Sequence, residues 1–156
     1  MTISPEMQTR LDKITKLQEE GYELNRFINS CVPVLKRPNG KNQRILWGSP
    51  AGFSWAGYFW QSILYYKIKE YSYFYYLAAV TCVTVIAQDQ FAEGIGNLIG
   101  IVFAIYFGFY FPYSRQLAIE SNKSEYGMFR SIIVGSLFGT VAAIAGAIVG
   151  IAITSI

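Results

Sequence analysis

The chain has 156 residues, of which 53 % are hydrophobic and only 15 % are charged, and its net charge is +3. A soluble domain usually carries about 25 % charged residues, so this composition argues against an ordinary soluble domain. Two cysteines and no histidine offer no zinc motif and no disulfide framework. The small net charge argues against a nucleic-acid-binding protein.

The first expected element is a cytoplasmic amphipathic helix that starts at Ser4. Ser4 suits the N-cap, Pro5 the first helical position and Glu6 the first turn. One apolar stripe then recurs at three- and four-residue spacing, with a gap at Gly21: Met7, Leu11, Ile14, Leu17, Leu24, Phe27 and Ile28. We expect this stripe to pack against the rest of the protein. The alternative is a helix that presents the stripe to a cytoplasmic partner.

Residues 31–50 complete a cytoplasmic region over residues 1–50 and are expected to form a loop. Prolines and the Asn39-Gly40 and Gly48-Ser49-Pro50 segments punctuate it. It contains no acidic residue and four cations, Lys36, Arg37, Lys41 and Arg44. Each cation near a membrane can bind anionic lipid headgroups with about 1 kcal/mol. The alternative is that these cations only fix the topology of the chain.

A membrane domain is expected over residues 51–156, beginning with an interfacial amphipathic helix at residues 53–69. Its expected headgroup-level anchors are Trp55, Trp60, Tyr65 and Tyr66. On a helix, Trp60 falls on the apolar face, whereas Ser54 and Gln61 fall on the polar face. A fourth span is the alternative, but the part of the segment that follows Pro50 is too short to cross unaided.

Three membrane spans are expected at residues 71–87, 95–113 and 131–156, none of which contains Asp, Glu, Lys or Arg. Pro112 is expected to end the second span. All 13 Lys and Arg residues precede Tyr71 or lie in the loop over residues 114–130, whereas the loop over residues 88–94 has acids and no cation. The positive-inside rule therefore predicts a cytoplasmic N-terminus and a C-terminus on the far side.

The third span carries two Gly-x-x-x-Gly pairs, formed by Gly135, Gly139, Gly146 and Gly150. Small residues let helix backbones approach closely in lipid. The pattern predicts tight helix packing, either within this chain or with another chain. A pore lined by glycine is a third interpretation.

Features of enzymes and of ion-coupled transporters are missing from the sequence. The expected spans lack the ionisable residues that mark proton relays and ion paths. We find no catalytic triad pattern, metal cluster or phosphate-binding loop. We therefore expect a protein that is not an enzyme, with no catalytic residues, no cofactor and no metal.

The aromatic segment Phe53-x-Trp55-Ala56-x-Tyr58-Phe59, followed by Tyr66-x-x-Lys69, resembles the signature of a family of small bacterial inner-membrane proteins of unknown function. The resemblance continues through Gly96-Asn97 and covers about residues 53–118. The chain departs from the family pattern at Gln61-Ser62, where Gly-Pro would give a kink. The resemblance implies a bacterial inner membrane and helical hairpins, and it implies no activity.

Together these features predict an all-α, multi-pass membrane protein. The expected function is that of an accessory or scaffold subunit, which packs through the third span and presents its N-terminal helix to a partner. The alternative is a small homo-oligomeric channel or pore-forming protein, and a weaker alternative is a protective protein of the bacteriocin-immunity kind. Expected partners are the lipid bilayer, another membrane protein or a second copy of the chain, and a cytoplasmic protein.

Overall fold

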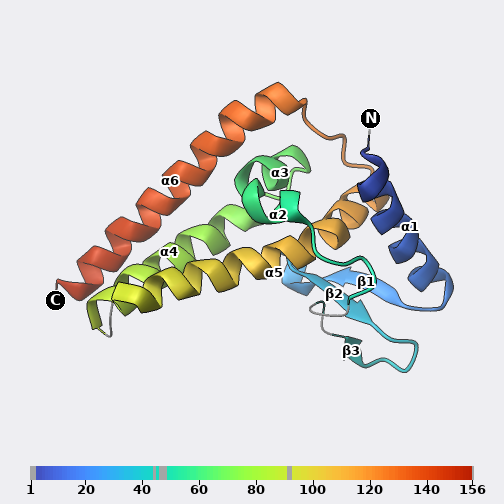
Figure 1. Cartoon of the computed structure of the whole chain (residues 1–156), viewed down its shortest axis with the longest axis horizontal. Helices are drawn as coiled ribbons and strands as arrows, with labels where there is room; N and C mark the ends of the chain where they lie inside the picture. The colour runs from blue at the N-terminus through green and yellow to red at the C-terminus, as the bar shows by residue number, and fades with distance from the viewer. Residues whose placement is uncertain (1–2, 44, 46–48, 91–92, 156) are drawn as a thin grey trace.

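The structure, a computed structural model, describes residues 3–43, 45, 49–90 and 93–155. Within these residues the chain is mostly helical. Three long helices run between two ends of the molecule: α4 (Ser72–Gln90), α5 (Glu93–Glu120) and α6 (Met128–Thr154). The C-terminus lies beside the α4–α5 hairpin, whereas the N-terminal helix and a small sheet gather at the other end, here called the cap end (Figure 1).

Two of these helices are long and apolar enough to cross a membrane. They cover Gly94–Glu120 and Met128–Thr154, with 27 residues each, which corresponds to about 40 Å of helix. Only 28 % and 17 % of their most apolar windows are buried. A core helix of a soluble protein hides most of its apolar surface, and these two helices do not. The expected first span lies within α4, which is helical but less apolar.

The N-terminal helix α1 covers Pro5–Glu19 and begins as expected. The Ser4 hydroxyl accepts a hydrogen bond from the Met7 amide at 3.3 Å. The expected continuation through Ile28 was wrong, because Gly21 takes a left-handed conformation with φ +90° and ends the helix. The apolar stripe of α1 is buried in this chain at Met7, Leu11 and Ile14.

A three-stranded antiparallel sheet follows α1, so the expectation of an all-α protein with a loop over residues 31–50 was wrong here. Its strands are β1 (Glu23–Arg26), β2 (Pro33–Lys36) and β3 (Asn42–Gln43), in that order. Leu24 of β1 pairs with Leu35 of β2. Both side chains are buried in one cluster with residues of α1 and α5, namely Ile14, Phe109, Tyr113 and Leu117. The sheet and α1 therefore pack on the last turns of α5.

A one-turn 3-10 helix, η1 (Phe27–Asn29), joins β1 to β2. Its central residue, Ile28, has φ 47° and an exposed side chain. A β-branched residue is rarely found in this left-handed region. The turn therefore keeps an apolar side chain in a strained conformation on the surface.

Two short helices, α2 (Trp55–Phe59) and α3 (Gln61–Lys67), replace the expected single interfacial helix. The backbone breaks at Trp60, although the Gly-Pro pair expected to cause a kink is missing. The expectation that Ser54 and Gln61 face water was wrong, because both side chains are buried and hydrogen-bond inside the fold. Trp60 is 60 % exposed.

The break in α5 expected at Pro112 does not occur, and the helix continues to Glu120. Proline lacks an N–H, so it leaves the carbonyl four residues earlier, on Gly108, without its helical donor. The Ser54 amide donates to that carbonyl at 3.0 Å. Gly108 also lacks a Cβ, which would collide with the Phe53 ring. The start of α2 therefore docks on α5 where the proline has freed a hydrogen-bond acceptor.

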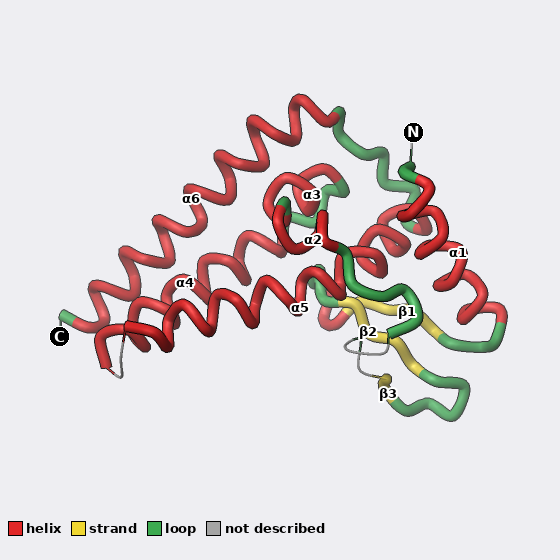
Figure 2. Tube along the Cα trace, viewed as in Figure 1, coloured by secondary structure: helices red, strands yellow, loops and turns green. Residues whose placement is uncertain are grey.

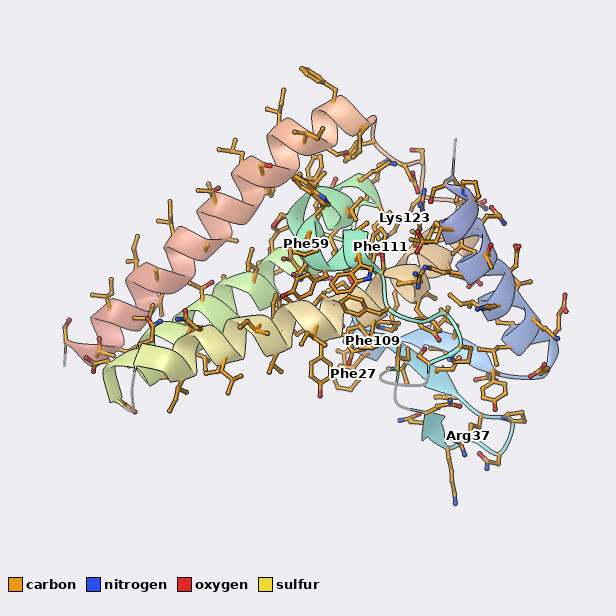
Figure 3. All side chains as sticks on the ribbon, viewed as in Figure 1. Phe27, Arg37, Phe59, Phe109, Phe111 and Lys123 are labelled. Carbon is orange, nitrogen blue, oxygen red and sulfur yellow. The ribbon has the colours of Figure 1, made fainter. Side chains whose placement is uncertain are left out.

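Two buried carboxylates join the loops at the cap end. Glu70, between α3 and α4, accepts from Arg26 at 2.6 Å and from Lys123 at 2.9 Å. Lys123 comes from the segment that links α5 to α6 and lies near α1 (Figure 3). Glu125 of the same segment pairs with Arg115 at 2.8 Å and with Lys67 at 3.3 Å. Each acid therefore neutralises two cations from different elements.

Replacing Pro112 with alanine should loosen α2 from α5. The new amide would compete with the Ser54 amide for the Gly108 carbonyl, since it can form the normal helical hydrogen bond. We expect faster hydrogen exchange at the Ser54 amide, measured by mass spectrometry of the detergent-solubilised protein. Pro5→Ala, at the first position of α1, is the control and should leave this exchange unchanged. Unchanged protection in Pro112→Ala would contradict the docking described above.

Glu70→Gln should destabilise the fold by about 3 kcal/mol, because it leaves two cations without their partner. Glu6→Gln removes only the exposed partner of Arg10 and should cost less than about 1 kcal/mol. The comparison can be made by chemical unfolding in detergent micelles, followed by circular dichroism. Equal losses of unfolding free energy in the two variants would show that the Glu70 cluster contributes no more to stability than a surface ion pair does.

Candidate functional site

A cleft with a volume of about 590 Å³ lies between α5 and α6. It exists because α4 packs against both α5 and α6, while these two helices diverge (Figure 2). Helices α2 and α3 close its end nearest the cap. We call it the α5–α6 cleft. Its lining includes small or hydroxyl-bearing residues from all three long helices: Thr81, Thr84, Gly100, Ala104, Ser136, Gly139, Thr140 and Ala143.

The four glycines of the expected third span fix the position of α6, and all four are buried. A Cβ at Gly139 would lie 2.5 Å from the Ser62 hydroxyl of α3. A Cβ at Gly135 would meet the Ile63 backbone at 2.9 Å. Further along, one at Gly146 would collide with the Ala78 carbonyl, and one at Gly150 would contact α4 at 2.8 Å. The glycine face is therefore covered by α3 and α4 of the same chain.

Gln61 holds the capped end of the cleft together. Its side-chain amide donates to the carbonyls of Tyr58 at 3.0 Å and Ala104 at 3.1 Å. Its carbonyl oxygen accepts from the Tyr73 hydroxyl at 3.0 Å. One glutamine thus connects α2, α5 and α4 through hydrogen bonds that are shielded from solvent. Such bonds are strong in surroundings of low polarity, and they specify a single arrangement.

The polar side-chain groups that line the cleft are hydroxyls, the Gln61 amide and the indole N–H of Trp60. The Thr81 and Thr140 hydroxyls donate to their own helices, to the Leu77 and Ser136 carbonyls at 2.9 and 3.0 Å. Each oxygen still has a lone pair for another donor. Gly100 faces open space, because nothing lies within 4 Å of a Cβ placed there.

The lining residues of the cleft favour binding over a chemical reaction. They include no Asp, Glu, Lys, Arg, His or Cys. A serine or threonine hydroxyl without an adjacent base is a weak nucleophile. Within the described part of the chain, no group of three His, Cys, Asp or Glu side chains could hold a metal ion. The cleft can therefore accept an apolar or weakly hydrogen-bonding surface.

The structure separates the expected anchors from the expected headgroup-binding cations. Trp55 and Trp60 are exposed, whereas Tyr65 and Tyr66 are buried. Lys36, Arg37 and Lys41 lie at the β2–β3 turn, which Figure 3 places at the opposite end of the sheet from Phe27. Arg44 lies outside the described residues. Figure 1 shows this end of the sheet apart from α2, which begins at Trp55, so these cations do not form one site with that tryptophan.

The buried thiol of Cys31 is not poised for nucleophilic chemistry. Burial raises its pKa to about 11, with a smaller contribution from the nearby Glu70 carboxylate. The thiolate is the reactive form, so Cys31 stays protonated and inert near neutral pH. Burial also raises the pKa of Tyr65, whose hydroxyl has no hydrogen-bond partner among the described residues.

Several important side chains were missed by reasoning from the sequence. Ser54 and Gln61 were assigned to a water-facing surface, and Glu70 and Glu125 were given no role. A lone acid directly after two cations, as Glu70 follows Lys67 and Lys69, was the available signal for an ionic cluster. No pattern in the sequence predicted the partners of Gln61, because these lie on distant elements.

No protein-family model, curated protein or solved structure matches the chain. The resemblance to small bacterial inner-membrane proteins therefore stays a prediction. The site can be interpreted only from its own geometry.

Gly146→Ala should destabilise the protein by about 1–3 kcal/mol, because the new methyl group collides with the Ala78 carbonyl of α4. Gly100→Ala is a matched control, since its methyl group would enter open space. We expect Gly100→Ala to be neutral or stabilising, by up to about 1 kcal/mol, through its better helix propensity. Thermal unfolding of both variants in detergent measures the difference. A neutral Gly146→Ala would contradict the close α4–α6 contact.

Proposed function

We propose that this protein is a non-enzymatic accessory subunit of a membrane complex, with three spans, and that its α5–α6 cleft receives a transmembrane helix of another membrane protein. The membrane location is supported by the exposed apolar surfaces of α5 and α6. Water would make such surfaces costly, whereas lipid does not. Because α4 and α5 form a hairpin, α4 crosses the same layer as α5, and its 19 residues give about 28 Å of helix.

The distribution of charge supports the proposed orientation. The described cations lie in the cap, in the loops that join it to the long helices, or on the adjoining helix ends. The other end of the molecule carries Asp89 and no cation between residues 70 and 114. The positive-inside rule then places the cap in the cytoplasm and the C-terminus on the far side. The resemblance stated above favours a bacterial inner membrane.

The observation that carries the proposed function is the divergence of α5 and α6 around a cleft whose lining includes small side chains from all three long helices. Helices associate in lipid mainly through close packing, which small residues permit. Gly100 and Ala104 of α5 and Ala143 of α6 lie on facing walls. The hydroxyls of Thr81 and Thr140 can accept hydrogen bonds from a helix seated between them. An inserted helix would complete a four-helix arrangement.

A different protein fits this cleft better than a second copy does. The outer face of α6 carries large side chains, including Ile133, Leu137, Ile144, Ile148 and Ile151. The glycine face of α6 is already covered by α3 and α4. A second copy therefore cannot offer this face to the cleft, and the small side chains of α6 that stay uncovered, Ser136, Thr140 and Ala143, line its own cleft. For the same reason, a pore lined by these glycines would require α6 to leave its own chain.

The cap offers a cytoplasmic partner only polar surface on α1. Its apolar residues Met7, Leu11 and Ile14 are buried. Lys13, Lys16 and Glu19 remain on or near the surface. We therefore place the main partner contact in the membrane, and any contact at α1 would be electrostatic.

Photo-crosslinking in native membranes tests the proposed function. A photoreactive amino acid at Gly100 or Thr140 should give one discrete adduct, and the same group at Leu137 or Ile148 on the outer face should not. Purification in mild detergent and mass measurement of the intact particle then identify the adduct. A mass that matches a homodimer would show that the occupant of the cleft is a second copy of the chain and not a different protein. No discrete adduct from either cleft position would overturn the proposal.

Filling the cleft should dissociate the complex without unfolding the subunit. In Gly100→Phe, the ring would occupy the space into which a partner helix is proposed to pack. We expect loss of co-purification by at least tenfold, with unchanged thermal unfolding of the isolated chain. Ile148→Phe is the control on the outer face and should co-purify like the wild type.

A further inference from the structure

We propose that the protein binds an anionic phospholipid on the side of α6 that faces away from the α5–α6 cleft, with the phosphate on Lys69 and Arg130 and an acyl chain in a groove between α4 and α6. This inference rests on the proposed membrane location. It does not depend on the partner proposed for the cleft.

The groove is suited to a hydrocarbon chain. It has a volume of about 290 Å³ and is lined by Tyr71, Phe74, Tyr75, Ala78, Phe138, Val141, Ala142 and Ala145. These residues cover two turns of each helix, which is about 10 Å along the axis. Apart from the tyrosine hydroxyls, the lining side chains are apolar. The groove is therefore complementary to an acyl chain and not to a soluble polar molecule.

Two cations contact the same tyrosine ring, that of Tyr126, at the cap end of this groove. The ammonium group of Lys69 lies 4.8 Å from the centre of the Tyr126 ring, and the Arg130 guanidinium lies 4.3 Å from it. The Tyr126 hydroxyl is 2.7 Å from the hydroxyl of Tyr71, which lines the groove. Tyr126 therefore connects the cations to the apolar groove, and the two hydroxyls add polar groups at its entrance.

Neither cation has an acidic partner among the described residues. Both buried acids nearby are already occupied, Glu70 by Arg26 and Lys123, and Glu125 by Arg115 and Lys67. Among the described residues, the Lys69 ammonium group donates only to the neutral Ser124 hydroxyl, at 2.8 Å. Two like charges held against one ring repel each other, and a bound anion would turn this repulsion into attraction. A phosphate is the anion that the membrane surface supplies at this depth.

The backbone also positions Lys69 at this entrance. Lys69 follows α3 in a left-handed conformation with φ 58°. The Lys69 amide donates to the Tyr66 carbonyl at 3.0 Å, and the Glu70 amide donates to the Tyr65 carbonyl at 2.9 Å. Glycine or asparagine is more usual at such a helix end. A lysine here brings its charge to the point where α3, α4 and α6 meet.

Lipid titration of the full chain tests the headgroup contacts. Binding of phosphatidylglycerol to the detergent-solubilised protein can be measured by native mass spectrometry, with phosphatidylcholine as the neutral probe. Lys69→Asn with Arg130→Gln should weaken phosphatidylglycerol binding about 30-fold and phosphatidylcholine binding less, because the choline cation of that lipid already offsets its phosphate. Asparagine tolerates the left-handed conformation of residue 69. Arg37→Gln with Lys41→Gln removes the same charge at the β2–β3 turn and should have little effect. Equal weakening by both pairs would overturn the proposed site.

Further measurements distinguish a bound lipid from a bound soluble phosphate, and they test the membrane location separately. Ala145→Phe should block the groove and weaken phosphatidylglycerol binding, whereas Ile144→Phe, on the neighbouring outer surface, should not. Displacement of the lipid by millimolar glycerol phosphate would show a phosphate site without a lipid groove and contradict the proposal. Resistance of the protein to alkaline extraction from membranes tests the membrane location separately, so a failure there is not confused with a failure of the lipid site.

Discussion

The arrangement around the cleft depends on the carbonyl of Gly108, which has no hydrogen-bond donor within its own helix. Pro112 removes the helical donor for this carbonyl, and the Ser54 amide takes its place. This contact holds α2 against α5, and Gln61 at the start of α3 then bonds to the Ala104 carbonyl. With α3 fixed, Gly139 can rest on Ser62. The path of α6 away from α5 is therefore set by a hydrogen bond that α5 could not form within itself.

The ion pairs at the cap end likewise connect several elements through only two carboxylates. Glu70 and Glu125 each bind two cations from separate segments, so two carboxylates tie the sheet, the end of α3, the end of α5 and the α5–α6 connection together. A buried acid with two cations is well compensated, and removing it leaves both cations unpaired. Lys69 and Arg130 remain outside this arrangement, which explains why an external anion suits them.

The long helices could be predicted from the sequence, but their surroundings could not. Most of each expected span, at residues 71–87, 95–113 and 131–156, coincides with α4, α5 or α6, because long uncharged stretches are local signals. The strands were missed because they are at most four residues long and Leu24 also fits a helical period. The polar face of α2 and α3 was wrongly predicted because burial of Ser54 and Gln61 depends on acceptors in α5. Distant partners of this kind leave no periodic signal.

The length of α5 has a mechanical consequence. Its 28 residues give about 42 Å of helix, so as a proposed membrane span it would extend beyond a hydrocarbon layer of about 30 Å. The cap is packed directly on its last turns, through Tyr113 and Leu117. A long helix adapts to a thinner bilayer by tilting. In this protein a tilt of α5 would also tilt the cap that is packed on its end. The thickness of the bilayer would therefore determine the angle between the membrane and the elements of the cap, α1 and the sheet.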